Sequence, residues 1–187
     1  LEPTLYNFNI FSAFLELAAK APLMNYPIHV KLNTGLNRLG FSQIEVPKIL
    51  VEIKKTAHIK VQSLFSHLAA SEDLEEKEFT TSQINSFASI AKQCYKYLKY
   101  EPILYILNTS GVVNYSEAQF DMVRIGIGLY GFGNDAEETA QLKNTHNLKS
   151  IISQIHTIEP GETVGYNRAF AAKKTTKTAT IPLGHAD

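Results

Sequence analysis

The sequence lacks several features that would assign it to a particular class of protein. It has one cysteine, Cys94, so no disulfide can form within the chain, and this favours a reducing compartment. No apolar run approaches the roughly 18 residues that a membrane span needs. Lys and Arg total 18, as do Asp and Glu, so no basic excess indicates a nucleic-acid partner. We therefore expect a globular cytoplasmic protein with neither a nucleic acid nor a membrane as partner.

Common cofactor and metal motifs are missing as well. The sequence contains no GxxxxGK or GxGxxG phrase, and no His, Cys and Asp cluster has metal-ligand spacing, so we expect no metal. Cys94 lies in a helical-looking stretch without a neighbouring base, and we interpret it as a packing residue rather than a nucleophile. The chain begins without Met and stops inside a strand-like phrase, so we expect a piece of a longer polypeptide.

What is present is an alternation of helices and strands. Apolar residues of the first helix recur every three or four positions, and Pro22 ends it. Pro47 suits the first turn of the second helix, and Ser71 is the expected cap of the third, with a break near Thr80 and Thr81. The alternation predicts an α/β fold with a parallel sheet. The predicted helices cover 7–20, 43–56 and 71–97, and the predicted strands cover 27–35, 58–69, 102–110 and 122–131.

The composition changes around Asn134. Residues 1–134 form the predicted βα domain, and 135–145 are polar and read as a linker. Residues 146–187 alternate more strongly, carry Thr and Val, and turn at Pro160-Gly161, which predicts antiparallel strands of a second domain.

Polar residues lie at or just beyond the end of each predicted strand of the first domain. In a βα barrel the carboxyl ends of the strands carry the active site. Any one of these residues alone has an ordinary structural explanation, whereas the recurrence over four strands indicates a shared pocket. Hydroxyl, glycine and arginine groups suit an anion. The residues are Lys31, Thr34, Arg38, His67, Asn108, Thr109, Arg124 and Gly126.

Arg124 is the least expected of these residues. It lies inside "FDMVRIGIGLYGFG" (120–133), which is otherwise almost entirely apolar or glycine. A buried guanidinium without a partner is very costly, so this arginine needs a specific role.

Four phrases together resemble alanine racemase, a pyridoxal-phosphate enzyme of the barrel type. They occur in the family's order and span nearly the whole chain. The resemblance implies the C-terminal part of a (β/α)8 TIM-type barrel, about its last four strands, followed by the start of an antiparallel β domain. The phrases are "HVKLNTGLNRLGF" (29–41), "FSHLAASED" (65–73), "LNTSGVVNYSEAQFDMVRIGIGLYG" (107–131), and "EPGETVGYNRAF" with "ATIPLGHAD".

The resemblance also implies a role for each polar residue. Arg124 matches the arginine that faces the pyridine nitrogen of the cofactor, and His67 matches the histidine that supports it. Arg38 matches an arginine that contacts the phenolic oxygen and the substrate carboxylate. Lys31 matches a lysine that many members carry as a carbamate. The remaining matches are the phosphate ligands Thr109, Gly126 and Ile127, with Asn108 before them, and Tyr166 near the active-site entrance.

The implied activity is the interconversion of L-alanine and D-alanine for peptidoglycan of the bacterial cell wall, by a homodimer. Neither the Schiff-base lysine phrase nor the catalytic tyrosine of the family is found, so we expect the chain alone to be inactive, to bind cofactor weakly and to self-associate. Asn33 and His185 depart from the usual Asp and Tyr. A fusion of the parent protein to a cell-wall peptide ligase stays open.

Two alternatives stay open beside this interpretation. The first is another pyridoxal-phosphate enzyme on the same scaffold, either an amino-acid decarboxylase or a small homeostasis protein. Arg124 disfavours the decarboxylase, which uses an acid there, and the trailing β domain disfavours the homeostasis protein. The second alternative is a non-catalytic half barrel that binds phosphate or a metabolite.

Overall fold

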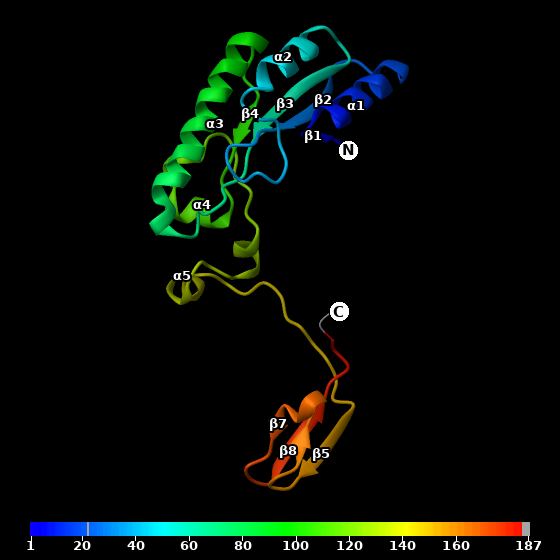
Figure 1. Cartoon of the computed structure of the whole chain (residues 1–187), viewed down its shortest axis with the longest axis vertical. Helices are drawn as coiled ribbons and strands as arrows, with labels where there is room; N and C mark the ends of the chain where they lie inside the picture. Colours follow the sequence, from blue (N-terminus) through cyan, green and yellow to red (C-terminus); the bar gives the residue numbers. More distant parts are fainter. Residues whose placement is uncertain (22, 185–187) are drawn as a thin grey trace. The chain divides into compact units, whose positions relative to one another are not determined.

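The computed structural model describes residues 1–21 and 23–184, and the chain divides into two units. The first unit runs from Leu1 to Thr145 and the second begins at His146 (Figure 1). Within the described residues, no helix has the length and apolar character needed to cross a bilayer. Pro22, the predicted end of the first helix, and His185 lie outside the described residues.

A four-stranded parallel sheet forms the centre of the first unit, with its strands in sequence order. The parallel pairing confirms the predicted α/β class. Leu5, Val30, Leu64 and Leu104 are in register across all four strands and are buried, so they form one apolar row of the core. The strands are β1 (Thr4–Leu5), β2 (Tyr26–Lys31), β3 (Ile59–Phe65) and β4 (Ile103–Tyr105).

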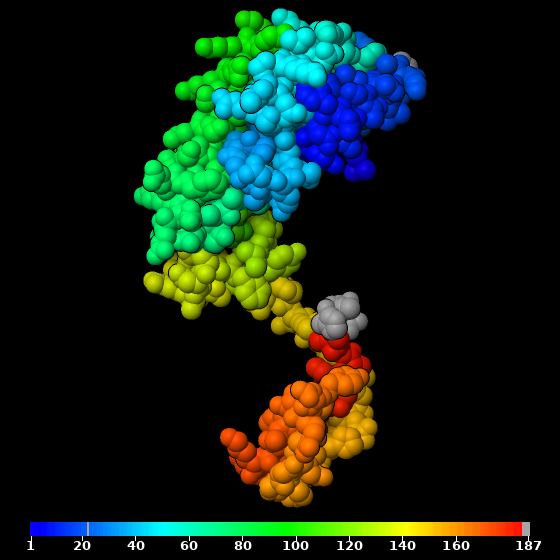
Figure 2. All heavy atoms as spheres, viewed as in Figure 1, coloured from blue at the N-terminus to red at the C-terminus, as the bar shows by residue number. Residues whose placement is uncertain are grey.

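Three long helices pack against this core and lie along one face of the sheet (Figure 1). Each buries one apolar stripe, as amphipathic helices do. Asn7 caps the first by accepting a hydrogen bond from the Ile10 amide, and Pro47 lies in the first turn of the second. The helices are α1 (Phe8–Lys20), α2 (Val46–Lys54) and α3 (Lys77–Leu98). Figure 2 shows side chains filling the spaces that the ribbon leaves between these elements.

The predicted strand at 122–131 does not form. The chain there is irregular up to Gly126 and then enters a 3-10 helix, η3 (Ile127–Tyr130). It still follows the edge of β4, because Asp121 N donates to Leu104 O and Arg124 N donates to Leu107 O. These bonds are three residues apart instead of alternating, so no ladder develops. A short strand that the sequence analysis missed, β1, is the fourth member of the sheet.

The start of α3 also differs from the prediction. Ser71 is buried and donates to Asn108 Oδ1 at 2.7 Å, so it is not a helix cap. Asp73 instead caps a 3-10 turn, η1 (Leu74–Glu76), which leads into α3. The predicted break near Thr80 and Thr81 is absent, because buried Thr80 donates its hydroxyl to Ala70 O and α3 continues through both positions.

Besides η3, three short helices follow β4 in the first unit. The first two are α4 (Thr109–Asn114) and η2 (Ser116–Ala118). The third, α5 (Ala136–Gln141), lies within the predicted linker, where Asp135 caps it by accepting from the Glu138 amide. The segment 135–145, which the sequence analysis interpreted as a linker, therefore contains a six-residue helix that its polar composition did not predict.

The second unit consists of antiparallel strand pairs, as its alternating pattern predicted. β5 (Gln154–Ile158) pairs with β8 (Thr176–Thr180), and β6 (Thr163–Val164) pairs with β7 (Phe170–Ala171). The predicted turn forms at Pro160-Gly161, where Glu162 N donates to Glu159 O and Gly161 has φ +92°. Glycine suits this turn because it accepts a positive φ without a Cβ clash. A 3-10 turn, η4 (Tyr166–Arg168), precedes β7.

Candidate functional site

Residues that follow two neighbouring strands of the sheet, together with a third segment of the chain, gather around one cavity of about 300 Å³. Its walls come from the segments after β3 and β4 and from the irregular segment before η3. Six of the eight wall residues are ones that the sequence analysis singled out. The lining residues are His67, Asn108, Thr109, Ser110, Arg124, Ile125, Gly126 and Ile127.

Arg124 is half-buried and is held by neutral acceptors. Its Nη2 donates to Ser66 O at 2.8 Å and to His67 Nδ1 at 2.9 Å. Its Nε is buried and has no hydrogen-bond partner. Among the described residues, no carboxylate forms an ion pair with it. Burial lowers the pKa of this guanidinium, as expected for a cation removed from water.

His67 is neutral at physiological pH. Burial first, and then the charges of Arg124, Arg38 and Lys31, lower the pKa of its imidazole to about 4. Because a guanidinium can only donate, Nδ1 must accept from Arg124, and the ring proton therefore resides on Nε2. Buried Gln83 of α3 supports this loop, since its Oε1 accepts from the Ala69 amide at 3.0 Å.

A second group of contacts forms a small cradle of backbone amides. Thr109 Oγ1 accepts from Gly126 N at 3.0 Å and from Gly128 N at 3.3 Å. A Cβ on Gly128 would lie 2.7 Å from Thr109 Cγ2, so only glycine fits there. Asn108 Oδ1 accepts from Gly111 N and fixes the start of α4. Two amides that converge on one oxygen can also hold an oxygen of a phosphate.

Lys31 and Arg38 do not line the cavity. Lys31 ends β2 and is half-buried; burial, together with the charges of Arg38 and Arg124, lowers the pKa of its amine. Arg38 is exposed on the loop after β2, near enough for its charge to lower the pKa of His67. Asn33 organises that loop, since its Oδ1 accepts from the amides of Gly35 and Asn37.

Several supporting residues were missed by the sequence analysis. Ser66 offers a carbonyl to Arg124, and its hydroxyl donates to Leu32 O at 2.8 Å. Thr34, which was identified, hydrogen-bonds Ser66 Oγ at 2.7 Å, so it acts as a support and not as part of the cavity wall. Phe65 was also missed. The alternation of side chains along β2 and β3 could have indicated that it lies beside Lys31, because the two residues are in register. Tyr166, in the second unit, is fully exposed.

The residues present fit a cofactor that carries a ring nitrogen and a phosphate. The buried Nε of Arg124 is a donor that needs an acceptor, and the amide cradle is a set of donors suited to an anion. Within the described part of the chain, no group of three or more His, Cys, Asp or Glu is placed to hold a metal ion.

Comparison with known proteins gives one family for both units. The family model "Alanine racemase, N-terminal domain" matches residues 1–134, and "Alanine racemase, C-terminal domain" matches residues 145–187. An alanine racemase of Treponema denticola is 34% identical over 164 residues, covering 86% of this chain and 43% of the relative. That of Clostridium tetani is 30% identical over 192 residues, covering 100% of this chain and 49% of the relative.

Solved structures agree with the sequence comparisons. The alanine racemase of Streptomyces lavendulae superposes with a TM-score of 0.86 at 22% identity, covering 98% of this chain and 50% of that one, which shows the fold. The alanine racemase of Bartonella henselae with covalently bound pyridoxal phosphate has a TM-score of 0.74 at 25% identity, covering 100% and 50%. The chain thus spans about half the length of the relatives it matches. Because both of its units match in sequence and in fold, this chain belongs to the alanine racemase family.

Proposed function

We propose that the protein containing this chain interconverts L-alanine and D-alanine with pyridoxal phosphate. The observation that carries the proposal is the state of Arg124: a guanidinium held in place by Ser66 and His67, with a buried Nε that has no partner. Family membership supports the same reaction. Residues 1–134 are then the cofactor-binding part, and 146–187 the start of a β domain.

In this proposal Arg124 would hold the cofactor by donating its free N–H to the pyridine nitrogen. A guanidinium does not give up its proton in proteins, so the ring nitrogen accepts a hydrogen bond and stays unprotonated. Bound pyridoxal phosphate supplies the electron sink that makes the α-hydrogen of alanine acidic. With Arg124 in place of an acid, the bound cofactor would be a weaker electron sink, and side reactions of the substrate would be limited. His67, neutral at pH 7, keeps Nη2 of Arg124 oriented.

The remaining site residues divide into two tasks. We propose that Thr109 and the backbone of Gly126 and Ile127 bind the phosphate, with Asn108 fixing the turn before them. The amides of Gly126 and Gly128, which donate to the Thr109 hydroxyl in this structure, would then be released from it. Arg38 takes the substrate carboxylate, and a carbamate on Lys31 would hold Arg38 by charge. The lowered pKa of Lys31 increases the fraction of its amine that is neutral, which is the form that reacts with carbon dioxide.

Racemisation needs a proton acceptor on each face of the α-carbon. The family's lysine and tyrosine phrases for these acceptors do not occur in this sequence. We therefore propose that the 187-residue chain alone is inactive and that the whole protein, a cytoplasmic homodimer supplying D-alanine for peptidoglycan, carries the activity.

The first prediction tests this assignment in the whole protein. When it is loaded with pyridoxal phosphate, the whole protein should convert L-alanine into D-alanine. Chiral chromatography measures this conversion. Arg124→Gln removes a charged hydrogen bond worth about 1.5–3 kcal/mol, so cofactor affinity and turnover should fall about 10- to 100-fold. Lys92→Ala, an exposed change on α3, should match the unmodified protein.

Three results would contradict the proposal. One is an absence of D-alanine from the loaded whole protein. Another is carbon dioxide release from an amino acid, which would indicate the decarboxylase. The third is cofactor binding without any conversion of amino acids, which would indicate a non-catalytic phosphate-binding protein.

A further inference from the structure

The environment of Arg124 poses an energetic problem that its hydrogen bonds do not solve. Removing a guanidinium from water is costly unless the charge is compensated. Its two acceptors, Ser66 O and His67 Nδ1, are both neutral. Lys31 and Arg38 add like charge nearby and no described carboxylate pairs with Arg124, so another source of stabilisation is needed.

Two stacked aromatic rings lie against this guanidinium. Phe65 ends β3 and Tyr105 ends β4, and the two residues are in register, so they share a face of the sheet. Their ring centroids are 4.8 Å apart with an interplanar angle of 11°. Arg124 Cζ lies 5.3 Å from the Phe65 centroid and 5.4 Å from the Tyr105 centroid. We name Phe65 and Tyr105 the ring pair.

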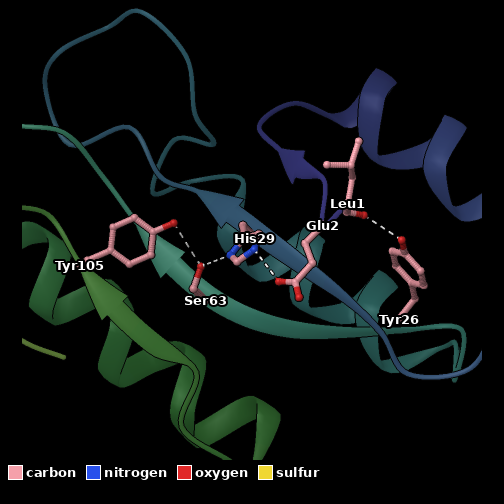
Figure 3. Close-up of polar contacts among 6 residues, drawn as sticks. All are labelled: Leu1, Glu2, Tyr26, His29, Ser63 and Tyr105. Carbon is pink, nitrogen blue, oxygen red and sulfur yellow. Dashed lines mark hydrogen bonds and ion pairs between the residues drawn. The ribbon is translucent and has the colours of Figure 1, made fainter. Parts of the chain in front are cut away.

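A row of polar contacts reaches Tyr105, one member of the ring pair, across the sheet. Figure 3 shows Glu2, His29, Ser63 and Tyr105 following one another across the sheet. Glu2 Oε2 is 2.9 Å from His29 Nε2, His29 Nδ1 is 2.6 Å from Ser63 Oγ, and Ser63 Oγ donates to Tyr105 Oη at 3.5 Å. Ser63 is 1% exposed, so this row anchors Tyr105 and offers no accessible nucleophile.

Rings differ from a carboxylate in one respect that matters for Arg124. A carboxylate would bind the guanidinium through two of its N–H groups. An aromatic ring attracts a cation within about 6 Å through its π electrons and uses no N–H donor. The ring pair can therefore stabilise the charge while Nε stays free, which is the state observed.

We propose that Phe65 and Tyr105 are positioning residues. They stabilise the charge of Arg124, as an acidic partner otherwise would, and they keep its Nε available to the cofactor. The proposal rests on the proposed function, since it assigns Nε to the pyridine nitrogen. It predicts that the aromatic character of both residues matters more than the hydroxyl of Tyr105.

Two pairs of variants separate ring from volume and from hydroxyl. Tyr105→Leu and Phe65→Leu remove a ring, whereas Tyr105→Phe and Phe65→Tyr keep it. In the whole protein labelled with nitrogen-15 arginine, Arg124→Lys identifies the Arg124 Nε–H signal by its loss. We expect this signal to be ring-shifted and slow to exchange with water, to stay so in the ring-keeping variants, and to exchange at least about tenfold faster in the leucine variants.

Cofactor binding is the second measurement, and it separates the two proposals. The dissociation constant of pyridoxal phosphate should rise about tenfold in the leucine variants and change less than about twofold in the ring-keeping ones. If the unmodified protein binds no cofactor, the proposed function is wrong. The Arg124 Nε–H signal still tests whether the ring pair positions Arg124.

The ring pair has its own contradicting outcomes. An unmodified protein whose Arg124 Nε–H exchanges with water as fast as that of free arginine would overturn it without any variant. So would folded leucine variants, with thermal unfolding close to that of the unmodified protein, whose Arg124 signal does not change.

Discussion

At the scale of single residues, charge and burial together decide the state of His67. Burial is the larger cause of its lowered pKa, and the guanidinium of Arg124 is the next. The neutral ring is what allows Nδ1 to accept from Arg124. A protonated His67 could only donate, so it would break this contact and place two cations side by side.

The second prediction concerns stability against pH. The unfolded chain should protonate His67 near pH 6.5, whereas the folded protein does so only near pH 4. Between these values the unfolded state binds more protons, so the contribution of His67 is fully present above pH 6.5 and is lost as the pH falls toward 4. His67→Asn keeps an acceptor but cannot titrate.

Urea unfolding across this pH range provides the measurement for His67. The unmodified protein should lose more unfolding free energy between pH 6.5 and pH 4 than His67→Asn does. Parallel pH profiles for the two proteins would mean that His67 is not held neutral in the folded state.

At the scale of elements, the segment before η3 covers the edge of β4 without becoming a strand. The Asp121 side chain accepts from Leu104 N at 2.8 Å, and the Asp121 amide donates back to Leu104 O. Three residues later, Arg124 N donates to Leu107 O, and this hydrogen bond fixes the backbone of Arg124 beside the segment that follows β4. These contacts cover the open edge of the sheet at β4, and they also position Arg124.

The third prediction follows from the Asp121 carboxylate. Asp121→Ala leaves the Leu104 amide without its acceptor, so the free energy of unfolding should fall by about 1–2 kcal/mol. Asp121→Asn keeps a side-chain oxygen and should lose less than half of that. Chemical denaturation measures both variants, and equal losses would show that the hydrogen bond to Leu104 contributes nothing.

At the scale of the whole molecule, the second unit buries very little. Ala172 is the one buried residue in its described part, up to residue 184. Apolar side chains including Leu148, Ile151, Ile155 and Phe170 are exposed. A monomeric protein seldom exposes so many apolar groups in a small unit, so we infer that other protein surface covers them.

The fourth prediction concerns the association of the chain. The 187-residue chain should self-associate, because the second unit exposes apolar groups and β1 pairs on one side only. Light scattering at increasing concentration should give a mass above 20.9 kDa. The substitution Ile151→Lys with Ile155→Lys should weaken the association, and a clean monomer of the unmodified chain would contradict the inference.

How far the sequence could predict the fold depends on how local each contact is. Helix α1 was predictable because its cap, Asn7, and its apolar spacing lie within a few residues of one another. The segment 122–131 was not, because an apolar run cannot reveal that Asp121 and Thr109 take up the hydrogen bonds of β4 and of the glycine amides. Ser71 was misassigned for the same reason, since its partner Asn108 is 37 residues away.

The sequence by itself determined the alternation of helices and strands, the antiparallel character of the second unit, and the phrases that resemble one family. These are encoded in periodicity and in residue order, which act over short distances along the chain. Tertiary structure alone decided that Arg124 reaches Ser66, 58 residues earlier, and that Phe65 and Tyr105 stack beside it. Such contacts depend on strand register and burial, and these arise only when the whole sheet has formed.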